Sequence, residues 1–493
     1  MAVRLSQDAL PTISKATVPT YDRSQLQPGI VHIGVGNFHR AHQAVYLDQL
    51  FEQGRDKEYA IVGAGLMPGD RRMREALASQ HYLTTVVEQS ATASRARVTG
   101  AMIDFAPVAD VDAILRRLTD PMTRIVSLTV TEGGYFLNSQ GKFEPSLLAT
   151  ENESAAEAGP KTVFGLIATA LQRRRLAGHA PFTVMSCDNI PHNGVVARAA
   201  VAGVAALQDD ALASHIEQDV AFPNAMVDRI TPATGEREKN ILATDFGIDD
   251  AWPVFCEDFS QWVLEDIFSD GRPAFDEVGV EFVSDVSPYE AMKIRILNGG
   301  HAVIAYPAGL MGIEFVHQAM QEPLVEAFLR KVESEEIIPT VPPVPNTDID
   351  EYFETIVRRF ANPKIGDTVR RLCLDGSNRQ PKFIVPTIRD RLNAGGSVEG
   401  LALESALWCR YCAGTTDAGE TIEPNDPEWA QLNALAKRAK SDPTAWLSME
   451  KVYGDVAREQ KFAGSFTKSL SALWNEGTRP VIKRYLDASK NSL

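Results

Sequence analysis

The sequence predicts an α/β domain followed by a mainly α-helical domain. With 493 residues, the chain exceeds the size at which a single hydrophobic core is usual. Up to Pro288, short apolar runs alternate with helical patterns, which is typical of a parallel sheet covered by helices. Beyond Pro288, strand-like runs become rare and the apolar spacing is helical. We therefore expect two domains, residues 1–286 and residues 287–493.

Four apolar runs are the expected strands of the first domain. Two of them flank a predicted helix in the segment 29–66, and the others lie at 124–130 and 182–187. Helical patterns occupy 111–118 and 162–178.

The second domain is expected to begin with a helix. Ser287 and Glu290 have capping-box spacing, and Pro288 stands at the first helical position. Further helical patterns follow, and a proline-rich loop is expected at 337–348. These patterns lie at 324–336, 352–360, 401–414 and 431–440.

Composition and charge exclude several classes of function. The formal net charge of −16 argues against nucleic acid or anionic lipid as a partner. The N-terminus lacks the apolar core of a signal peptide, and no apolar run reaches the roughly 18 residues of a membrane span. Five scattered cysteines indicate a reducing compartment, so we expect a soluble cytoplasmic protein. Cys409 and Cys412 form a Cys-x-x-Cys pair without a second pair, so structural zinc is not expected.

A glycine turn follows the first expected strand. Gly34 and Gly36 would let backbone amides approach a pyrophosphate, as in a Rossmann-type domain. His39 stands where the third glycine of the usual fingerprint would be. Asp70, after the second strand, is the candidate contact for the adenine ribose, which would favour NAD. A turn or cap role for Asp70 is the alternative, and the arginines that follow it could instead accept a 2′-phosphate.

Residues 287–301 carry three polar side chains in an apolar segment. On a regular α-helix, His301 would lie about 80° from Lys293, and Asn298 about 140° from it. The rise of about 12 Å between Lys293 and His301 would keep the two apart, unless Gly299-Gly300 distort the helix. A desolvated lysine can act as a general base. A surface lysine beside a core histidine is the alternative. The Tyr289–Lys293 spacing matches short-chain dehydrogenases, but their glycine pattern is absent here.

Six ordered motifs resemble the polyol-specific long-chain dehydrogenase/reductase family. The resemblance extends from Gly34 to beyond Lys382. The motifs are "GVGNFHRAH", "TEGGY", "SCDNIPHNG", "FPNAMVDRITP", "MKIRILNGGH" and "DGSNRQPKF".

This resemblance implies a Rossmann-type domain followed by a helical domain, and metal-independent, NAD-dependent oxidation of a free polyol, interconverting D-mannitol and D-fructose. Lys293 matches the catalytic lysine, and Asn189 and Asn298 match the amides that stabilise the alkoxide. His301 matches a residue that orients the substrate. The implied cofactor-binding residues are Gly34, Gly36, Asn37, Phe38, Arg40, Asp70, Glu132 and Asn189. The implied substrate-binding residues are Asp228, Lys293, His301, Arg371 and Arg379, and Arg379 stands where a relative has lysine.

Several alternatives stay open. Asn189 and Glu132 each follow an expected strand, where α/β sheets bind ligands. Glu132 is a hypothetical proton outlet for the lysine. The arginines at 371 and 379 could contact hydroxyls or an anion. Other activities within the family are a hexuronate reductase or a mannitol-1-phosphate dehydrogenase, and outside enzymes, a nucleotide-binding sensor. We expect a monomer.

Overall fold

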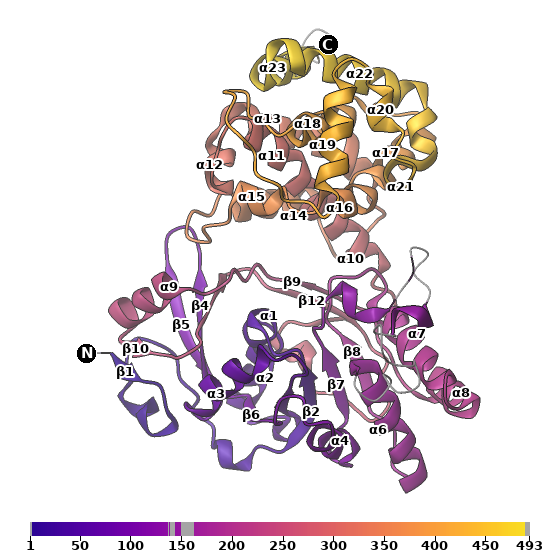
Figure 1. Ribbon diagram of the computed structural model, residues 1–493. Coiled ribbons are helices and arrows are strands. Elements are labelled where there is room, and N and C mark those ends of the chain that lie inside the picture. The colour runs from indigo at the N-terminus through magenta and orange to yellow at the C-terminus, as the bar shows by residue number, and fades with distance from the viewer. Residues whose placement is uncertain (1, 137, 139–142, 149–161, 489–493) are drawn as a thin grey trace. The chain divides into compact units, whose positions relative to one another are not determined.

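The computed structural model describes residues 2–136, 138, 143–148 and 162–488. The chain divides into two compact units, Met1–Ser287 and Pro288–Leu493. The first contains a parallel sheet with helices, and the second is built almost entirely from helices (Figure 1). The predicted fold class is confirmed.

The central sheet of the first unit has five parallel strands in the order β6-β3-β2-β7-β8. This order is that of a doubly wound sheet, whose direction of winding reverses between β2 and β7. All four expected strands are present. The strands are β2 (Pro28–Ile33), β3 (Ala60–Ala64), β6 (Met102–Phe105), β7 (Ile125–Leu128) and β8 (Thr183–Ser186).

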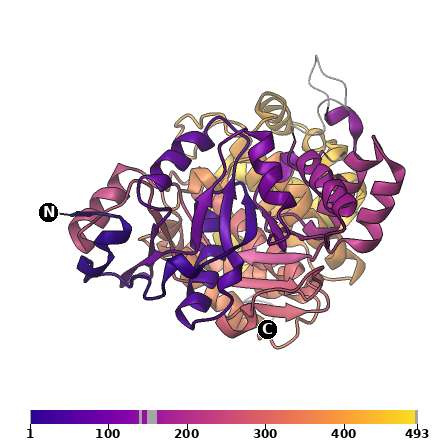
Figure 2. The ribbon, with the colours of Figure 1, turned by 90° about the horizontal axis from the view of Figure 1, so that it is seen from below.

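Helices cover both faces of this sheet. Val31 and Ile33 face the core made with α4, α6, α7 and α8, whereas Ile30 faces the core made with α2 and α3. Alternate strand residues thus enter opposite cores, as the period of two requires. Figures 1 and 2 both show α6, α7 and α8 together beside the sheet. The helices are α1 (Asn37–Ala41), α2 (Gln43–Glu52), α3 (Asp70–Ala78), α4 (Val111–Thr119), α6 (Val163–Ala177), α7 (Asn193–Ala206), α8 (Asp210–Asp219) and α9 (Glu236–Ile241).

Three smaller sheets of the first unit were not expected from the sequence. β1, β10 and β13 have only two or three residues, and the six-residue strands β4 and β5 contain several polar residues, so their apolar runs are weak. One has the order β13-β12-β9 and another β11-β4-β5, and β1 pairs with β10. The strands are β1 (Val3–Arg4), β4 (Thr84–Gln89), β5 (Ser94–Thr99), β9 (Ala225–Asp228), β10 (Ile248–Asp249), β11 (Val254–Glu257), β12 (Gln261–Glu265) and β13 (Glu281–Val283).

The second unit packs its helices around α18, whose residues from Gly400 to Cys412 are all buried. Two π-helical segments interrupt the pattern, η9 (Lys293–Asn298) and η10 (Glu333–Ile337). No described helix of either unit is both long enough and apolar enough to traverse a membrane. The α-helices are α10 (Ser287–Met292), α11 (Gly299–Leu310), α12 (Val316–Gln321), α13 (Pro323–Val332), α14 (Ile349–Phe360), α15 (Val369–Leu372), α16 (Gly376–Phe383), α17 (Val385–Asn393), α18 (Glu399–Cys412), α19 (Trp429–Ala439), α20 (Thr444–Leu447), α21 (Glu450–Tyr453), α22 (Gln460–Glu476) and α23 (Thr478–Ala488).

Candidate active site

Gly34 ends β2 in a conformation that requires glycine. Its φ is +95°, a value that side chains rarely tolerate, and its amide donates to the Ala64 carbonyl at 3.1 Å. A Cβ at this position would lie 2.1 Å from the Thr129 carbonyl oxygen. The glycine therefore allows the turn to pass directly over the end of β7.

Gly36 has no comparable steric reason within the protein. Its φ of −132° suits any residue, and its added Cβ would meet only the Gly34 carbonyl, at 3.7 Å. The missing side chain leaves space above the loop. A group that must approach the backbone closely, such as a pyrophosphate, fits that space.

The two glycines give a matched test. Gly34→Ala is expected to lower the stability of the first unit by about 1–3 kcal/mol or more and to abolish cofactor binding, because the new methyl group overlaps the backbone. Gly36→Ala should leave the unfolding midpoint nearly unchanged and weaken NADH binding. Thermal unfolding and NADH fluorescence titration measure both effects. A Gly36→Ala protein that binds NADH with the wild-type Kd would contradict this interpretation.

The helix after the glycines is shorter than expected. The sequence predicted one helix between the first two strands, but α1 ends at Ala41 and the backbone breaks at His42 before α2 begins. His42 has φ −121° and ψ −92°, outside the helical region. A helix of five residues has few aligned peptide dipoles, so the local backbone amides would contribute more to the binding of an anion than a helix dipole would.

His39 stands where the third glycine of the fingerprint would be, and its ring stacks on another histidine. Its ring lies 3.4 Å, centroid to centroid, from that of His32 on β2, and the two rings are nearly parallel. The hydroxyls of Ser127 and Thr129 contact the His32 nitrogens at 2.8 and 3.0 Å. The described residues contain no group of three or more metal-ligating side chains. This histidine pair thus packs α1 onto β2.

This packing makes stability depend on pH. Burial lowers the pKa of His32 from 6.5 to about 3, and that of His39 well below 6.5. The unfolded chain then binds more protons below pH 6.5, so the free energy of unfolding should decrease as pH falls, by up to about 1.4 kcal/mol per pH unit for each histidine. Denaturant unfolding at pH 5 and 7 measures this slope. His39→Gln should reduce it, and an unchanged slope would contradict the prediction.

Arg40 supports the glycine loop through hydrogen bonds of its guanidinium group. It is 1% exposed, and its guanidinium donates to the carbonyls of Gly36 and Trp252 and to the Asn37 side chain. Asn37 also donates to the Pro232 carbonyl at 3.1 Å, and the ring of Phe38 stacks on that of His42. Arg40 therefore orients the loop through internal contacts.

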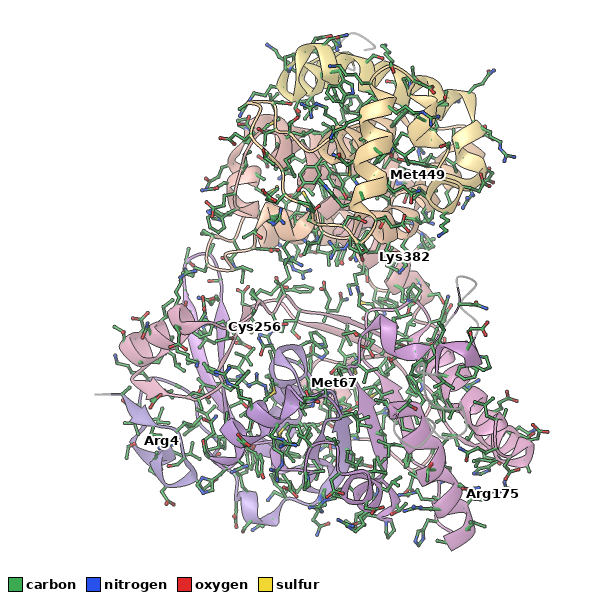
Figure 3. The ribbon with its side chains drawn as sticks, in the orientation of Figure 1. Arg4, Met67, Arg175, Cys256, Lys382 and Met449 are labelled. Carbon is green, nitrogen blue, oxygen red and sulfur yellow. The ribbon has the colours of Figure 1, made fainter. Side chains whose placement is uncertain are left out.

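Asp70 is the first residue of α3, on the loop that follows β3. One of its carboxylate oxygens accepts from the Met67 amide at 3.0 Å, and Gly65 leaves room for it, since a Cβ there would lie 2.5 Å from this oxygen. This contact is the turn role that was the alternative for Asp70, and the contact of this residue with the adenine ribose stays a prediction. Met67 beside it is 68% exposed (Figure 3). Arg72 stacks on the ring of Trp252, 5.4 Å from its centroid.

Asp188 forms hydrogen bonds that connect the segments following β7 and β8. Its buried carboxylate accepts from the amides of Val130 and Thr131 at 3.0 and 2.9 Å, and from the Tyr135 hydroxyl at 2.6 Å. Asn189, the next residue, is exposed. The two strand-end loops that carry Asn189 and Glu132 are therefore neighbours.

Strain marks the loop before Glu132. Thr131 has φ +67° and ψ 160°, a region that only glycine adopts readily. The side chain of Glu132 lies outside the described residues, so its hypothetical role as a proton outlet stays a prediction. Asp228 is the last residue of β9 and is 5% exposed, opposite Gln261 of β12.

The predicted α-helical spacing around Lys293 is wrong, because η9 is π-helical. In a π-helix, hydrogen bonds join residues five apart, which is the spacing of Lys293 and Asn298. The two side chains that a regular helix would separate by about 140° thus return to nearly the same face. Lys293 is only 7% exposed. Single π-helical turns of this kind are frequent at functional sites.

His301, near the start of α11, lies among arginines. Burial lowers its pKa well below 6.5, and the charges of Arg371, Arg359 and Arg379 lower it further. The ring stacks on Phe360 with 4.3 Å between centroids, and its buried Nε2 has no protein partner. A neutral imidazole with one free nitrogen is suited to a substrate hydroxyl.

Each of the two predicted arginines contacts a segment of the chain outside its own helix. Arg371 is paired with Asp367 through two hydrogen bonds, and Arg379 donates to the Leu372 carbonyl at 3.1 Å. Arg359 was missed by sequence reasoning. It is 7% exposed on α14, next to Phe360. The sequence signal that could have found it was an arginine on the apolar side of an amphipathic helical pattern, where arginine is rare.

Two motifs weighed in the sequence are structural. The Tyr289 hydroxyl, which a short-chain dehydrogenase would use for catalysis, donates to the Pro345 carbonyl at 3.2 Å. Cys409 and Cys412 lie in the buried helix α18 as free thiols.

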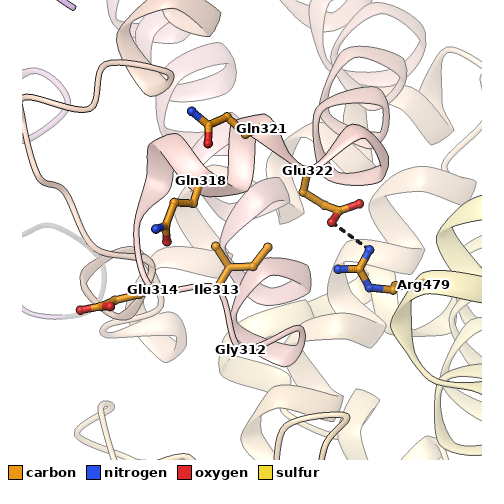
Figure 4. Close-up of a pocket in the computed structure, with 7 residues that line it drawn as sticks. All are labelled: Gly312, Ile313, Glu314, Gln318, Gln321, Glu322 and Arg479. Atoms are coloured by element: carbon orange, nitrogen blue, oxygen red, sulfur yellow. Dashed lines mark ion pairs between the residues drawn. The ribbon is translucent and has the colours of Figure 1, made fainter.

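A surface hollow of about 460 Å³ lies elsewhere in the second unit (Figure 4). Two of its charged side chains, Glu322 and Arg479, form an ion pair at 2.8 Å. None of the predicted site residues lines it. The lining residues are Gly312, Ile313, Glu314, Gln318, Gln321, Glu322 and Arg479.

Comparison with known proteins accounts for both units. Residues 28–277 match the mannitol dehydrogenase Rossmann domain, and residues 285–474 match the mannitol dehydrogenase C-terminal domain. The chain belongs to the mannitol dehydrogenase family. The family resemblance seen in the sequence is confirmed.

Relatives of this mannitol dehydrogenase family member cover almost its whole length. It is 58% identical over 473 residues to mannitol 2-dehydrogenase of Cereibacter sphaeroides, covering 96% of this chain and 99% of that protein. It is 42% identical over 492 residues to mannitol 2-dehydrogenase of Aspergillus fumigatus, covering 98% of both chains.

Solved structures of the family share the fold. The ternary complex of Pseudomonas fluorescens mannitol 2-dehydrogenase with NAD and D-mannitol has a TM-score of 0.88 and 41% identity, covering 98% of this chain and 100% of that one. A substrate-free D-sorbitol dehydrogenase has a TM-score of 0.88 and 34% identity, covering 97% of this chain and 100% of that one.

Proposed function

We propose that this protein is an NAD-dependent mannitol 2-dehydrogenase that interconverts D-mannitol and D-fructose without a metal ion. The observation that carries the proposal is the 58% identity to a mannitol 2-dehydrogenase over nearly the whole chain. The arrangement of Lys293, Asn298 and His301 supports it, because these residues offer a base, an amide donor and a hydroxyl partner. Hexuronate reductase or mannitol-1-phosphate dehydrogenase activity, within the same family, is a weaker candidate.

NAD, when bound, supplies the acceptor for the hydride that leaves the carbinol carbon. The space above Gly36 and the turn at Gly34 fit its pyrophosphate, and we propose that Asn37, Phe38 and Asp70 complete the binding residues. Arg40 acts by bracing this loop. Asp70, the first residue of α3 on the loop after β3, favours NAD over NADP, since its carboxylate would repel a 2′-phosphate.

We propose that Lys293 removes the hydroxyl proton. It is 7% exposed, and a lysine side chain in its amine form can accept a proton. Asn298 donates its amide to the oxygen as negative charge develops there, and Asn189 is proposed as the second amide donor. Because the π-helical turn aligns Lys293 with Asn298, the base and the donor can act on the same oxygen.

Substrate hydroxyls are proposed to contact His301, Arg371, Arg379 and Asp228. The free Nε2 of neutral His301 can accept from or donate to a hydroxyl, depending on its tautomer. The pairing of Arg371 with Asp367 neutralises part of the positive charge at this end. A neutral polyol therefore suits these residues better than a phosphate.

Glu132 is proposed to pass the proton of Lys293 to solvent. Glu132→Gln should lower the oxidation rate and change its pH profile, because the amide cannot accept a proton. Steady-state rates between pH 6 and 10 test this, with Glu144→Gln as a control on a nearby segment. An unchanged rate and profile would end the hypothesis.

The test of the function is a comparison of initial rates of NAD⁺ reduction. The substrates are D-mannitol, D-arabinitol, D-sorbitol, mannitol 1-phosphate and D-mannonate, each repeated with NADP⁺. The highest kcat/KM is expected for D-mannitol with NAD⁺. A preference for the phosphate or the acid would instead assign the arginines to an anion and the protein to a mannitol-1-phosphate dehydrogenase or hexuronate reductase. Absence of turnover with all five would favour a nucleotide-binding sensor.

We further propose a cytoplasmic monomer. The five free, buried cysteines suit a reducing compartment. Analytical ultracentrifugation at micromolar concentration tests the oligomeric state, and a species heavier than 54.0 kDa would contradict the monomer.

A further inference from the structure

Glu333 is a buried carboxyl that the proposed mechanism does not use. It begins the π-helical segment η10, is 0% exposed, and neither of its carboxyl oxygens has a hydrogen-bond partner. An ionised carboxylate without a partner is too costly to bury, so this group is uncharged. Such a buried unsatisfied group requires an explanation.

The position of Glu333 explains why its carboxyl is buried without a hydrogen-bond partner. A Cβ added to Gly300 would lie 2.9 Å from Glu333 Oε1, so the carboxyl occupies the space where a side chain at position 300 would begin. The same point is 3.5 Å from Phe360 Cε2, and Phe360 stacks on His301. Glu333, Gly300, Phe360 and His301 thus form one continuous packed cluster.

We propose that Glu333 is a positioning residue that holds the Gly300–His301 turn of α11 against Phe360, and thereby sets the direction of Asn298 and His301. This inference rests on the proposed function. The carboxyl fits only while it is uncharged, because an ion at this position would draw water or a counter-charge into the cluster and displace the turn.

Other charged groups on the surrounding helices do not neutralise Glu333. On α13, Arg330 pairs with Glu326 and Glu354, and Lys331 donates to the Tyr485 carbonyl. On α14 and α11, Arg359 and His301 lie near each other, and neither bonds to Glu333. Burial alone raises the pKa of Glu333 well above its usual range.

A double-mutant cycle tests the packing. Gly300→Ala and Glu333→Ala should each lower kcat/KM for D-mannitol, by about tenfold, through overcrowding and through an empty space respectively. The double variant should recover most of the loss, because the alanine methyl occupies the vacated space. Gly299→Ala is the matched control, since its Cβ would meet nothing closer than 3.7 Å. Losses that simply multiply in the double variant would overturn the proposal.

A pH profile provides a second readout. The rate of wild-type protein should fall at alkaline pH as Glu333 ionises, and Glu333→Gln should retain activity without that fall. Glu404→Gln is the control, since Glu404 is another buried carboxyl, with a pKa raised by burial to about 8, and bonds to Gln380 instead. If Glu404→Gln removes the alkaline fall and Glu333→Gln keeps it, the proposal is wrong.

Failure of the proposed function would be distinguishable. Wild-type protein without polyol turnover would refute the dehydrogenase assignment, and the same four proteins of the cycle could still be compared by thermal unfolding. Compensation between Gly300→Ala and Glu333→Ala in the unfolding midpoint would then support the packing. Independent effects on the midpoint would reject it.

Discussion

Replacing Lys293 by alanine is expected to lower turnover of D-mannitol by about 10²–10⁴-fold, the usual contribution of a general base. The reason is that Lys293, which is 7% exposed at the start of the π-helical turn, is the proposed acceptor of the hydroxyl proton. NADH affinity should be retained, because the glycine loop belongs to the other unit. Stopped-flow single-turnover rates and NADH fluorescence measure the two properties separately.

The matched control for Lys293→Ala is Lys437→Ala, which removes an exposed lysine of α19 in the same unit. It should keep the wild-type rate. Addition of a small primary amine should restore part of the rate to the Lys293 variant, since the amine can enter the vacated space and act as the base. A loss of less than about tenfold, without amine rescue, would mean that the lysine is structural.

Replacing Asn298 by alanine is expected to lower kcat by roughly 10²–10³-fold, as for removal of one oxyanion-hole donor. The π-helical spacing brings Asn298 nearly onto the face of the helix that carries Lys293, so we propose that its amide donates to the oxygen that loses the proton. Asn298→Asp should be at least as damaging, because a carboxylate cannot donate and repels the developing alkoxide. Steady-state kinetics with D-mannitol measure both variants.

The two Asn298 variants also distinguish catalysis from folding. Asn393→Ala, at the exposed end of α17, is the control for loss of an asparagine in this unit. If Asn298→Ala raised KM and left kcat unchanged, the amide would be a contributor to uniform binding of the substrate instead of a transition-state donor.

The sequence predicted the parts of this protein that depend on local pattern. The strands at 29–34 and 182–187 were predictable because buried parallel strands are continuous apolar runs, and the helical texture after Pro288 because amphipathic spacing persists through it. The family followed from six ordered motifs. Gly34 was predictable for the same reason, since its tight turn leaves a local signature.

Other features depended on contacts between distant residues. The strands β9 and β12 are short and gain their pairing from each other, so neither has a strong pattern alone. The stacking of His39 on His32, and the turn role of Asp70, arise where a loop meets a strand or folds back on itself. No spacing rule reports such meetings.

The helical segment that carries Lys293 shows this division most clearly. The sequence by itself determined that Lys293, Asn298 and His301 lie on one apolar segment, because identity and order are local properties. Only the tertiary structure decided that this segment is π-helical between Lys293 and Asn298, and that His301 lies among Arg359, Arg371 and Arg379. The physical reason is that a π-turn costs free energy in isolation and persists only where packing supports it. Here residues of η10, among them Glu333, pack against Gly299 and Gly300.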